Sequence, residues 1–159
     1  MKHLDFQEYL DNIKEVLATE FKEKRVTLFE DIEPDLEILY NPAYLESILI
    51  NLISNAIKYK HPDRDPEITI SARKRADSVY IRVTDNGMGI DLSKHGDKLF
   101  GMYKTFHGND NAKGIGLYIT RNQIESLGGN IKVESEVDRG TTFKIDFGKQ
   151  VRSPEMVLE

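Results

Sequence analysis

The sequence predicts an α+β fold: a two-layer α/β sandwich in which a mixed, mostly antiparallel sheet carries about three helices on one face. Two observations support this class. Three segments repeat apolar residues at helical spacing, and about six shorter segments alternate apolar and polar residues as half-buried strands do. Tight turns separate two pairs of these strands, which predicts antiparallel hairpins.

Length and composition favour a single folded domain over residues 1–149, followed by a tail, 150–159, that lacks periodicity and is predicted to be disordered. Hydrophobic residues make up 39% of the chain, as in an ordinary soluble protein. The net charge of −5 argues against a nucleic-acid partner. No apolar run reaches the roughly 20 residues of a membrane span, so we expect no direct membrane contact. Without cysteine the chain has no disulfide or thiolate metal site, which fits a cytoplasmic location.

The first part of the chain predicts two helices and two short strands. The expected elements are a helix from residue 5 to about 24, strands at Arg25–Glu30 and Leu36–Tyr40, and a helix from Pro42 to about Lys60. The second helix has a clear beginning, because Asn41 is a good N-cap and proline at the first helical position loses no hydrogen bond.

The second part predicts four strands and one helix. The expected elements are strands at Glu67–Arg75, Val79–Thr84, Asn130–Glu136 and Thr141–Phe147, and a helix from Gly114 to Leu127. Between Asp91 and Lys113 the periodicity is lost, apart from a short possible helix near residues 98–104. A long irregular segment inside a compact domain is usually functional, so we expect a lid there.

The central motif, Asp85-Asn-Gly-Met-Gly-Ile90, directly follows a predicted strand. A carboxylate at this place can accept a hydrogen bond from an exocyclic amine, and the two glycines let backbone approach a flat ligand. Taken alone, the same residues more often mark a plain turn.

Three polar residues of the second helix, Asn51, Asn55 and Lys58, are spaced so that they share one helix face. Asparagine is a poor helix residue, so two at this spacing need a reason. An amide oxygen suits Mg²⁺, and the lysine at the helix end suits a phosphate. A solvated face with a lysine that complements the helix dipole explains the pattern equally well.

Two glycine motifs have a similar double interpretation. Gly114 and Gly116 at a helix start suit phosphate, because free N–H groups point outward there, but a tight turn into a helix explains them too. The run Gly140-Thr141-Thr142 fits either a hairpin turn or hydroxyls beside a ligand. The histidines lack metal-ligand spacing and are expected to be exposed structural residues: His3, His61, His95 and His107.

Together the motifs resemble the catalytic and ATP-binding domain of bacterial sensor histidine kinases, in the GHKL superfamily of gyrase, chaperone, histidine-kinase and mismatch-repair ATPases. The resemblance covers residues 5–148. Five segments are similar to the N, G1, F and G2 boxes and the glycine–threonine motif: Asn51–Tyr59, Asp85–Ile90, Leu99-Phe100 with Phe106, Lys113–Leu117 and Gly140–Phe143. The resemblance implies the Bergerat fold, with ATP and Mg²⁺ as cofactors.

The resemblance also implies a role for each motif residue. Asp85 would bind the adenine amino group, in a pocket shaped by Gly87, Gly89 and Ile90. Two residues would be catalytic: Asn55 as the Mg²⁺ ligand and Asn51 as a support for the polyphosphate. Further nucleotide contacts are implied for Lys58 and Lys104 at the phosphates, Tyr59 and Tyr103 beside the base or ribose, Gly114, Ile115, Gly116 and Leu117 in the G2 box, and Thr142 near the adenine.

The chain departs from the family pattern in three places. Ala112 stands where many members have the first G2-box glycine, which would stiffen the lid hinge. Asn41 replaces an acidic residue common before the N box. No H box is present, so the phosphoacceptor histidine is expected on a dimerisation/histidine-phosphotransfer domain of the same or another kinase, with a response regulator downstream.

Three functions follow from these motifs. A kinase domain would position Mg-ATP for γ-phosphoryl transfer to a histidine. A GHKL-type ATPase would need a glutamate general base at position 51, where this chain has Asn51, which takes no proton at neutral pH. A non-catalytic nucleotide-binding docking module is disfavoured by the intact asparagine, aspartate and glycine positions. The kinase is therefore the preferred interpretation.

Overall fold

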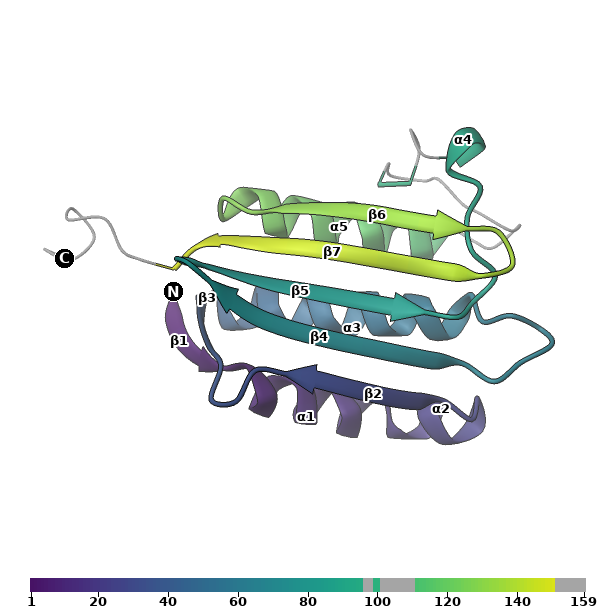
Figure 1. The fold of residues 1–159 in the computed structure, drawn as a ribbon, viewed down its shortest axis with the longest axis horizontal. Helices are drawn as coiled ribbons and strands as arrows, with labels where there is room; N and C mark the ends of the chain where they lie inside the picture. The colour runs from purple at the N-terminus through teal and green to yellow at the C-terminus, as the bar shows by residue number, and fades with distance from the viewer. Residues whose placement is uncertain (96–98, 101–110, 151–159) are drawn as a thin grey trace, which may run out of the picture.

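A five-stranded sheet in the order β2-β4-β5-β7-β6 forms one layer of the protein (Figure 1). The computed structural model describes residues 1–95, 99–100 and 111–150, with backbone only at residues 95 and 111–115. The strands are β2 (Thr27–Ile32), β4 (Glu67–Arg75), β5 (Ser78–Asp85), β6 (Asn130–Glu136) and β7 (Gly140–Lys149). β2 pairs with β4 in parallel and the other three pairs are antiparallel, which confirms the predicted mixed sheet.

Three long helices form the second layer and lie on one face of this sheet (Figure 1). They are α1 (Phe6–Val16), α3 (Pro42–Lys58) and α5 (Asn111–Ser126); the shorter ones are α2 (Ala18–Glu23) and α4 (Leu92–His95). The predicted two-layer sandwich is therefore confirmed. None of the helices in the described part of the chain combines the length and apolar character needed to cross a bilayer.

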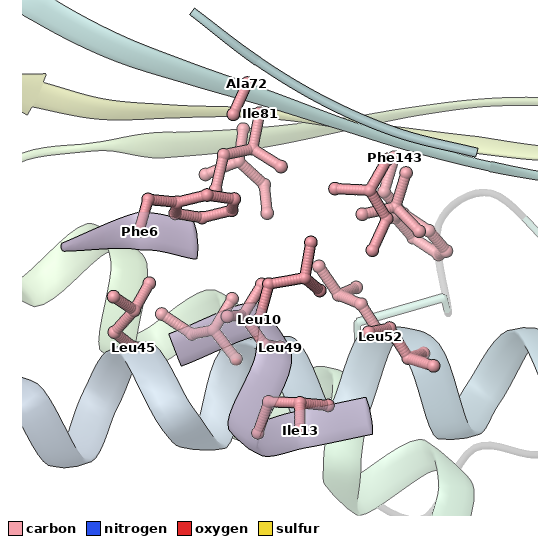
Figure 2. Close-up of a cluster of buried hydrophobic side chains, with 14 of the residues drawn as sticks. Phe6, Leu10, Ile13, Leu45, Leu49, Leu52, Ala72, Ile81 and Phe143 are labelled. Carbon is pink, nitrogen blue, oxygen red and sulfur yellow. The ribbon is translucent and has the colours of Figure 1, made fainter. Parts of the chain in front are cut away.

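The core fills the space between the helices and the sheet (Figure 2). Side chains of α1 and α3 point toward inward-facing residues of the strands, and the labelled members are Phe6, Leu10, Ile13, Leu45, Leu49, Leu52, Ala72, Ile81 and Phe143. The predicted apolar stripe of α3 is buried throughout. Burial of this stripe fixes which face of α3 is turned toward the sheet, and so fixes where its polar residues lie.

The helix α3 begins as predicted. The Asn41 side chain accepts a hydrogen bond from the Tyr44 N–H at 3.2 Å, and Pro42 is the first helical residue. The helix ends at Lys58, slightly earlier than expected, with Tyr59 as its C-cap. Its last turn therefore points at the loop that follows β5.

The N-terminal region differs most from expectation. A second sheet of two strands, β1 (Lys2–Asp5) and β3 (Glu37–Tyr40), pairs antiparallel. The single helix expected from residue 5 to 24 is divided at Leu17, although backbone hydrogen bonds continue across the break. Arg25 takes a left-handed φ of 59°, so β2 begins two residues later than predicted.

Two other boundaries differ as well. Helix α5 begins at Asn111 rather than at Gly114, so Gly116 lies inside the helix and only the first-turn N–H groups lack intrahelical partners. Gln150, assigned to the predicted tail, bonds to the β4–β5 turn and to β3: its N–H donates to the Asp77 carbonyl at 2.6 Å, and its side chain accepts from the Leu39 N–H at 2.5 Å. The rest of the predicted tail, residues 151–159, lies outside the described residues.

Candidate functional site

A pocket lies at the end of the sheet where β5 ends and β7 begins, beneath the last turns of α3 and beside α5. Its lining residues are Asn55, Tyr59, Asp85, Gly89, Ile90, Leu117 and Thr141. All but the last are site residues that the sequence predicts. The cavity itself measures about 10 Å³, room for about one water, so a larger ligand requires the walls to move apart.

The Asp85 carboxylate lies largely buried in this pocket. Its Oδ1 accepts a hydrogen bond from the Gly87 N–H at 2.8 Å. Burial raises the pKa of Asp85 to about 6, against the opposing effect of backbone hydrogen bonds from Gly87 and Thr141. At neutral pH the group is therefore an ionised, partly desolvated acceptor, which favours a ligand that donates a hydrogen bond to it.

Close packing explains both glycines of the loop after Asp85. A Cβ on Gly87 would lie 2.6 Å from the Tyr59 carbonyl oxygen, and one on Gly89, whose φ is +73°, would overlap the Glu136 carbonyl. The Met88 N–H donates to the Tyr59 carbonyl at 3.0 Å. The loop is thus held between the end of α3 and the β6–β7 hairpin. This packing requires both glycines, whether or not a ligand also approaches the loop.

Arg64 ties the same loop to the same hairpin. Its Nε donates to the Asn86 carbonyl at 2.7 Å, and its Nη2 lies 3.2 Å from the Gly87 carbonyl oxygen. The Nη2 also reaches the carbonyl oxygens of Asp138, at 2.5 Å, and Arg139, at 3.4 Å. One guanidinium therefore joins the two walls that flank Asp85, a role that no sequence pattern around this polar loop indicates.

The Asn55 side chain is 7% exposed and projects from α3 into the pocket. Its Oδ1 is buried and has no hydrogen-bond partner among the described residues. A buried amide oxygen left without a partner is costly, and it is the kind of hard, neutral ligand that Mg²⁺ accepts. The residues present therefore fit a Mg²⁺ ion, which binds through few protein ligands and keeps several waters.

Asn51, one turn earlier on α3, faces α5. Its amide nitrogen donates to the Thr120 hydroxyl at 3.2 Å, and that hydroxyl donates to the Gly116 carbonyl at 2.9 Å. Thr120 is fully buried and was not indicated by any sequence pattern. The two helices thus bring Asn51 and Gly116 side by side.

The structure does not bring Thr142 into the pocket. Its hydroxyl lies 3.0 Å from that of Thr84, on the sheet face away from the helices. Thr141 is the buried residue, paired in register with Asp85. Because side chains alternate along a strand, only one of the two threonines can face the pocket.

Ser135 was likewise missed. Its hydroxyl accepts from the Ile90 N–H at 2.7 Å and lies 2.8 Å from the Thr141 hydroxyl. It therefore links the end of the Asp85 loop to the two strands of the hairpin.

Residues 40–150, which include the whole pocket, match the family model described as "Histidine kinase-, DNA gyrase B-, and HSP90-like ATPase". That match covers more than half of the chain. The chain belongs to this family. The resemblance to catalytic domains of histidine kinases, and the fold it implies, are confirmed.

Two sequence relatives of this ATPase-family domain are a sensor protein and a signal transduction histidine-protein kinase. The chain is 32% identical over 152 residues to the aerobic respiration control sensor protein ArcB of Escherichia coli K12, covering 89% of this chain and 19% of ArcB. It is 34% identical over 116 residues to the signal transduction histidine-protein kinase ArlS of Staphylococcus aureus USA300, covering 71% of this chain and 25% of ArlS. The chain thus spans a quarter or less of the length of these relatives.

The nucleotide-free catalytic domain of the histidine kinase ThkA has the same fold as this ATPase-family domain. Its TM-score is 0.78 at 22% identity, over 94% of this chain and 97% of that one. The agreement in fold extends over nearly the whole sandwich.

The remaining predicted residues of this ATPase-family domain lie around the pocket or outside the described part. Lys58 is exposed and lines a separate crevice between α2 and α3. Gly114 and Ile115 belong to the first turns of α5, of whose side chains nothing is described. Tyr103, Lys104 and Phe106 lie outside the described residues.

The described part of the F box packs onto the core. Leu99 is fully buried, and the Phe100 ring meets the Phe143 ring edge-on, with centroids 6.3 Å apart. The Arg121 guanidinium lies 5.6 Å from the centre of the Phe100 ring. These contacts attach residues 99–100, which lie within the segment predicted to be a lid, to β7 and α5.

Proposed function

We propose that this chain is the ATP-binding catalytic domain of a sensor histidine kinase, a protein-histidine kinase module of a cytoplasmic two-component pathway. It would position Mg-ATP for γ-phosphoryl transfer to a histidine on a dimerisation domain, from which a response regulator takes the phosphoryl group. One observation carries the proposal: the buried amide oxygen of Asn55, which has no hydrogen-bond partner among the described residues, shares a pocket with the largely buried carboxylate of Asp85. The first suits Mg²⁺ and the second suits the amino group of adenine.

Each pocket residue then has a defined task. Asp85 accepts a hydrogen bond from the base, and Ile90 and Leu117 give it an apolar wall. Asn55 would hold Mg²⁺, which when bound neutralises charge on the phosphates. Outside the pocket, Lys58 at the end of α3 and the free N–H groups in the first turn of α5, which begins at Asn111, would receive the phosphate chain. The acceptor histidine supplies the nucleophile from a separate domain, so this chain contributes position and charge.

The alternative function, a GHKL-type ATPase, is disfavoured by Asn51. Its amide takes no proton at neutral pH, and its nitrogen is already bonded to Thr120. Asn51→Glu places a carboxylate at this position and should raise release of inorganic phosphate from ATP. Asn51→Gln, which keeps the amide, is the matched control. If both variants release phosphate equally, the residue at position 51 does not distinguish a kinase from an ATPase.

Calorimetric titration with a non-hydrolysable ATP analogue, with and without Mg²⁺, tests the nucleotide site directly. Asp85→Asn should weaken binding by about 1–3 kcal/mol, because it mispairs a buried polar group. Asn55→Ala should abolish the Mg²⁺-dependent part of the affinity. Asn130→Ala, an exposed asparagine on β6, is the control and should bind as the wild type does. Absence of binding by the wild type would favour the docking-module alternative.

A further inference from the structure

A strip of three cations crosses the sheet face that the helices leave uncovered. Arg82 on β5 is paired in register with Lys144 on β7, and Lys144 is paired with Lys132 on β6. All three lie at outward positions: Arg82 and Lys144 alternate with buried residues, and Lys132 lies between the half-buried Ile131 and Val133. In Figure 1 no described helix lies over this face.

This arrangement is unfavourable for the fold alone. Like charges directly opposite one another on adjacent strands are destabilising. Lys144 is compensated by Glu134, 2.9 Å from its Nζ. Arg82 and Lys132 make no ion pair within the part of the chain that the structure describes. Two uncompensated cations on a chain of net charge −5 indicate an interaction that is not internal.

The strip forms part of a groove of about 490 Å³ on this face. The next row across the sheet holds Arg73, Tyr80, Asp146 and Asn130, in register on successive strands. Tyr80 is 42% exposed and offers an aromatic surface beside the cations. The groove therefore combines charge with an apolar contact, the composition of a protein-binding surface.

We propose that this basic groove docks an acidic polypeptide segment of a partner protein. Carboxylates lie at its border: Asp31 pairs with Arg73 at 2.5 Å, and Glu33 with Arg75 at 3.5 Å. Asp146 lies within the groove wall. A uniform polyanion, such as nucleic acid or an anionic bilayer, would meet these carboxylates as well as the cations. A polypeptide can place its carboxylates only where the cations are.

The strand geometry gives the spacing of the partner's charges. Arg82 and Lys132 are separated by β7, which places them two inter-strand spacings, about 10 Å, apart. A chain in the polyproline II conformation rises about 3.1 Å per residue and has three residues per turn, so acidic residues three positions apart share one face and lie about 9 Å apart, close to this distance. The partner segment therefore carries a carboxylate at every third residue, or an equivalent spacing on a helix.

The test uses a short fluorescein-labelled peptide with glutamate at every third position and serine elsewhere, titrated with this chain at low and at physiological ionic strength. We expect saturable binding that weakens as salt rises. The Arg82→Gln/Lys132→Gln double variant should bind at least tenfold more weakly. It should be at least as stable to heat as the wild type, because the repulsion across the strip is removed.

The controls separate the groove from general charge attraction. Lys2→Gln/Lys22→Gln removes two exposed lysines from other elements and should leave peptide binding unchanged. The same peptide with glutamine for glutamate should not bind. Equal binding by wild type and the groove variant overturns the proposal. Tighter binding of a single-stranded oligonucleotide or of phosphatidylserine vesicles through Arg82 and Lys132 also overturns it. Nucleotide affinity is independent of these outcomes, since the groove lies on the opposite face from the helices.

Discussion

The side-chain nitrogen of Asn51 lies 3.2 Å from the hydroxyl oxygen of Thr120, and this contact joins α3 to α5 beside the G2 box. The same hydroxyl donates to the Gly116 carbonyl at 2.9 Å. Thr120 is fully buried, so neither bond is readily replaced by water. The contact fixes the distance between the helix that carries Asn55 and the helix that begins at the phosphate side of the proposed nucleotide site.

The first prediction concerns this contact. Thr120→Val keeps the shape of the side chain but removes the hydroxyl, which leaves the Asn51 amide without its partner. We expect the free energy of unfolding to fall by about 1–2 kcal/mol and nucleotide affinity to fall severalfold. Thr120→Ser keeps the hydroxyl and should retain the affinity. Denaturant titration and calorimetry measure both effects, and equal affinities for the two variants would contradict the proposed link.

The second prediction is a pH dependence that originates at Asp85. Burial raises the pKa of its carboxyl from 3.8 to about 6, so the folded state holds this proton more tightly than the unfolded state does. The group therefore favours folding at low pH, and its contribution is lost as pH rises through about 6. Between low and high pH, the contribution of Asp85 to the free energy of folding changes by at most about 3 kcal/mol.

Comparison with Asp85→Asn isolates that contribution. The stability of the wild type relative to this variant should decline between about pH 4 and pH 7 and then level off. Urea titrations of both proteins across this range give the difference directly. A difference that is constant with pH would mean that the Asp85 carboxyl is not buried as described.

Much of the site followed from local patterns. Asp85 could be placed because alternation identifies the strand it ends, and Asn55 because helical spacing sets it beside a buried stripe. For Thr141 the alternation along its strand is a signal that contradicts the prediction of Thr142. The inward residue Phe143 lies two positions later on the same strand, so alternation turns Thr141, not Thr142, toward the helices.

Other parts of the fold lack a local signal. Strand β1 has only one buried residue, Leu4, and its pairing with β3 depends on contacts distant in sequence. Arg64 lies in a polar loop, and its partners are backbone carbonyls, which no residue pattern reveals. Thr120 resembles any helix threonine until α3 is packed against it. These features are set by tertiary structure and become visible only when distant segments meet.

The third prediction contrasts two glycines with positive φ. Gly89→Ala would place a Cβ onto the Glu136 carbonyl, whereas Gly128→Ala, at φ +89°, meets no atom within 4 Å. The second change should cost only the left-handed strain, about 1–2 kcal/mol. The first adds an overlap with backbone that forces the loop after Asp85 away from the hairpin. We expect it to abolish nucleotide binding, measured by calorimetry, while Gly128→Ala still binds. Normal binding by Gly89→Ala would mean that this close contact is not needed.

The last prediction concerns Arg64, which bonds to four backbone carbonyls on both sides of Asp85. Lysine keeps the charge but lacks the planar fork, so Arg64→Lys can satisfy only some of these acceptors. The loop that carries Gly87 and the hairpin at Asp138 should then separate more readily. We expect about a tenfold loss of nucleotide affinity, equivalent to about 1.4 kcal/mol.

Arg25→Lys is the matched control for this change. Arg25 makes an exposed ion pair at 3.3 Å with Asp65, the residue that follows Arg64 in its loop. Exposed ion pairs of this kind contribute little to the free energy of folding. Its substitution should leave affinity and stability unchanged. Hydrogen exchange of the Gly87 and Met88 amides provides an independent measurement, because these amides should exchange faster in Arg64→Lys than in Arg25→Lys. If both variants exchange alike but only Arg64→Lys binds nucleotide weakly, Arg64 acts on the nucleotide through the hydrogen bonds of its guanidinium rather than by holding the two walls together.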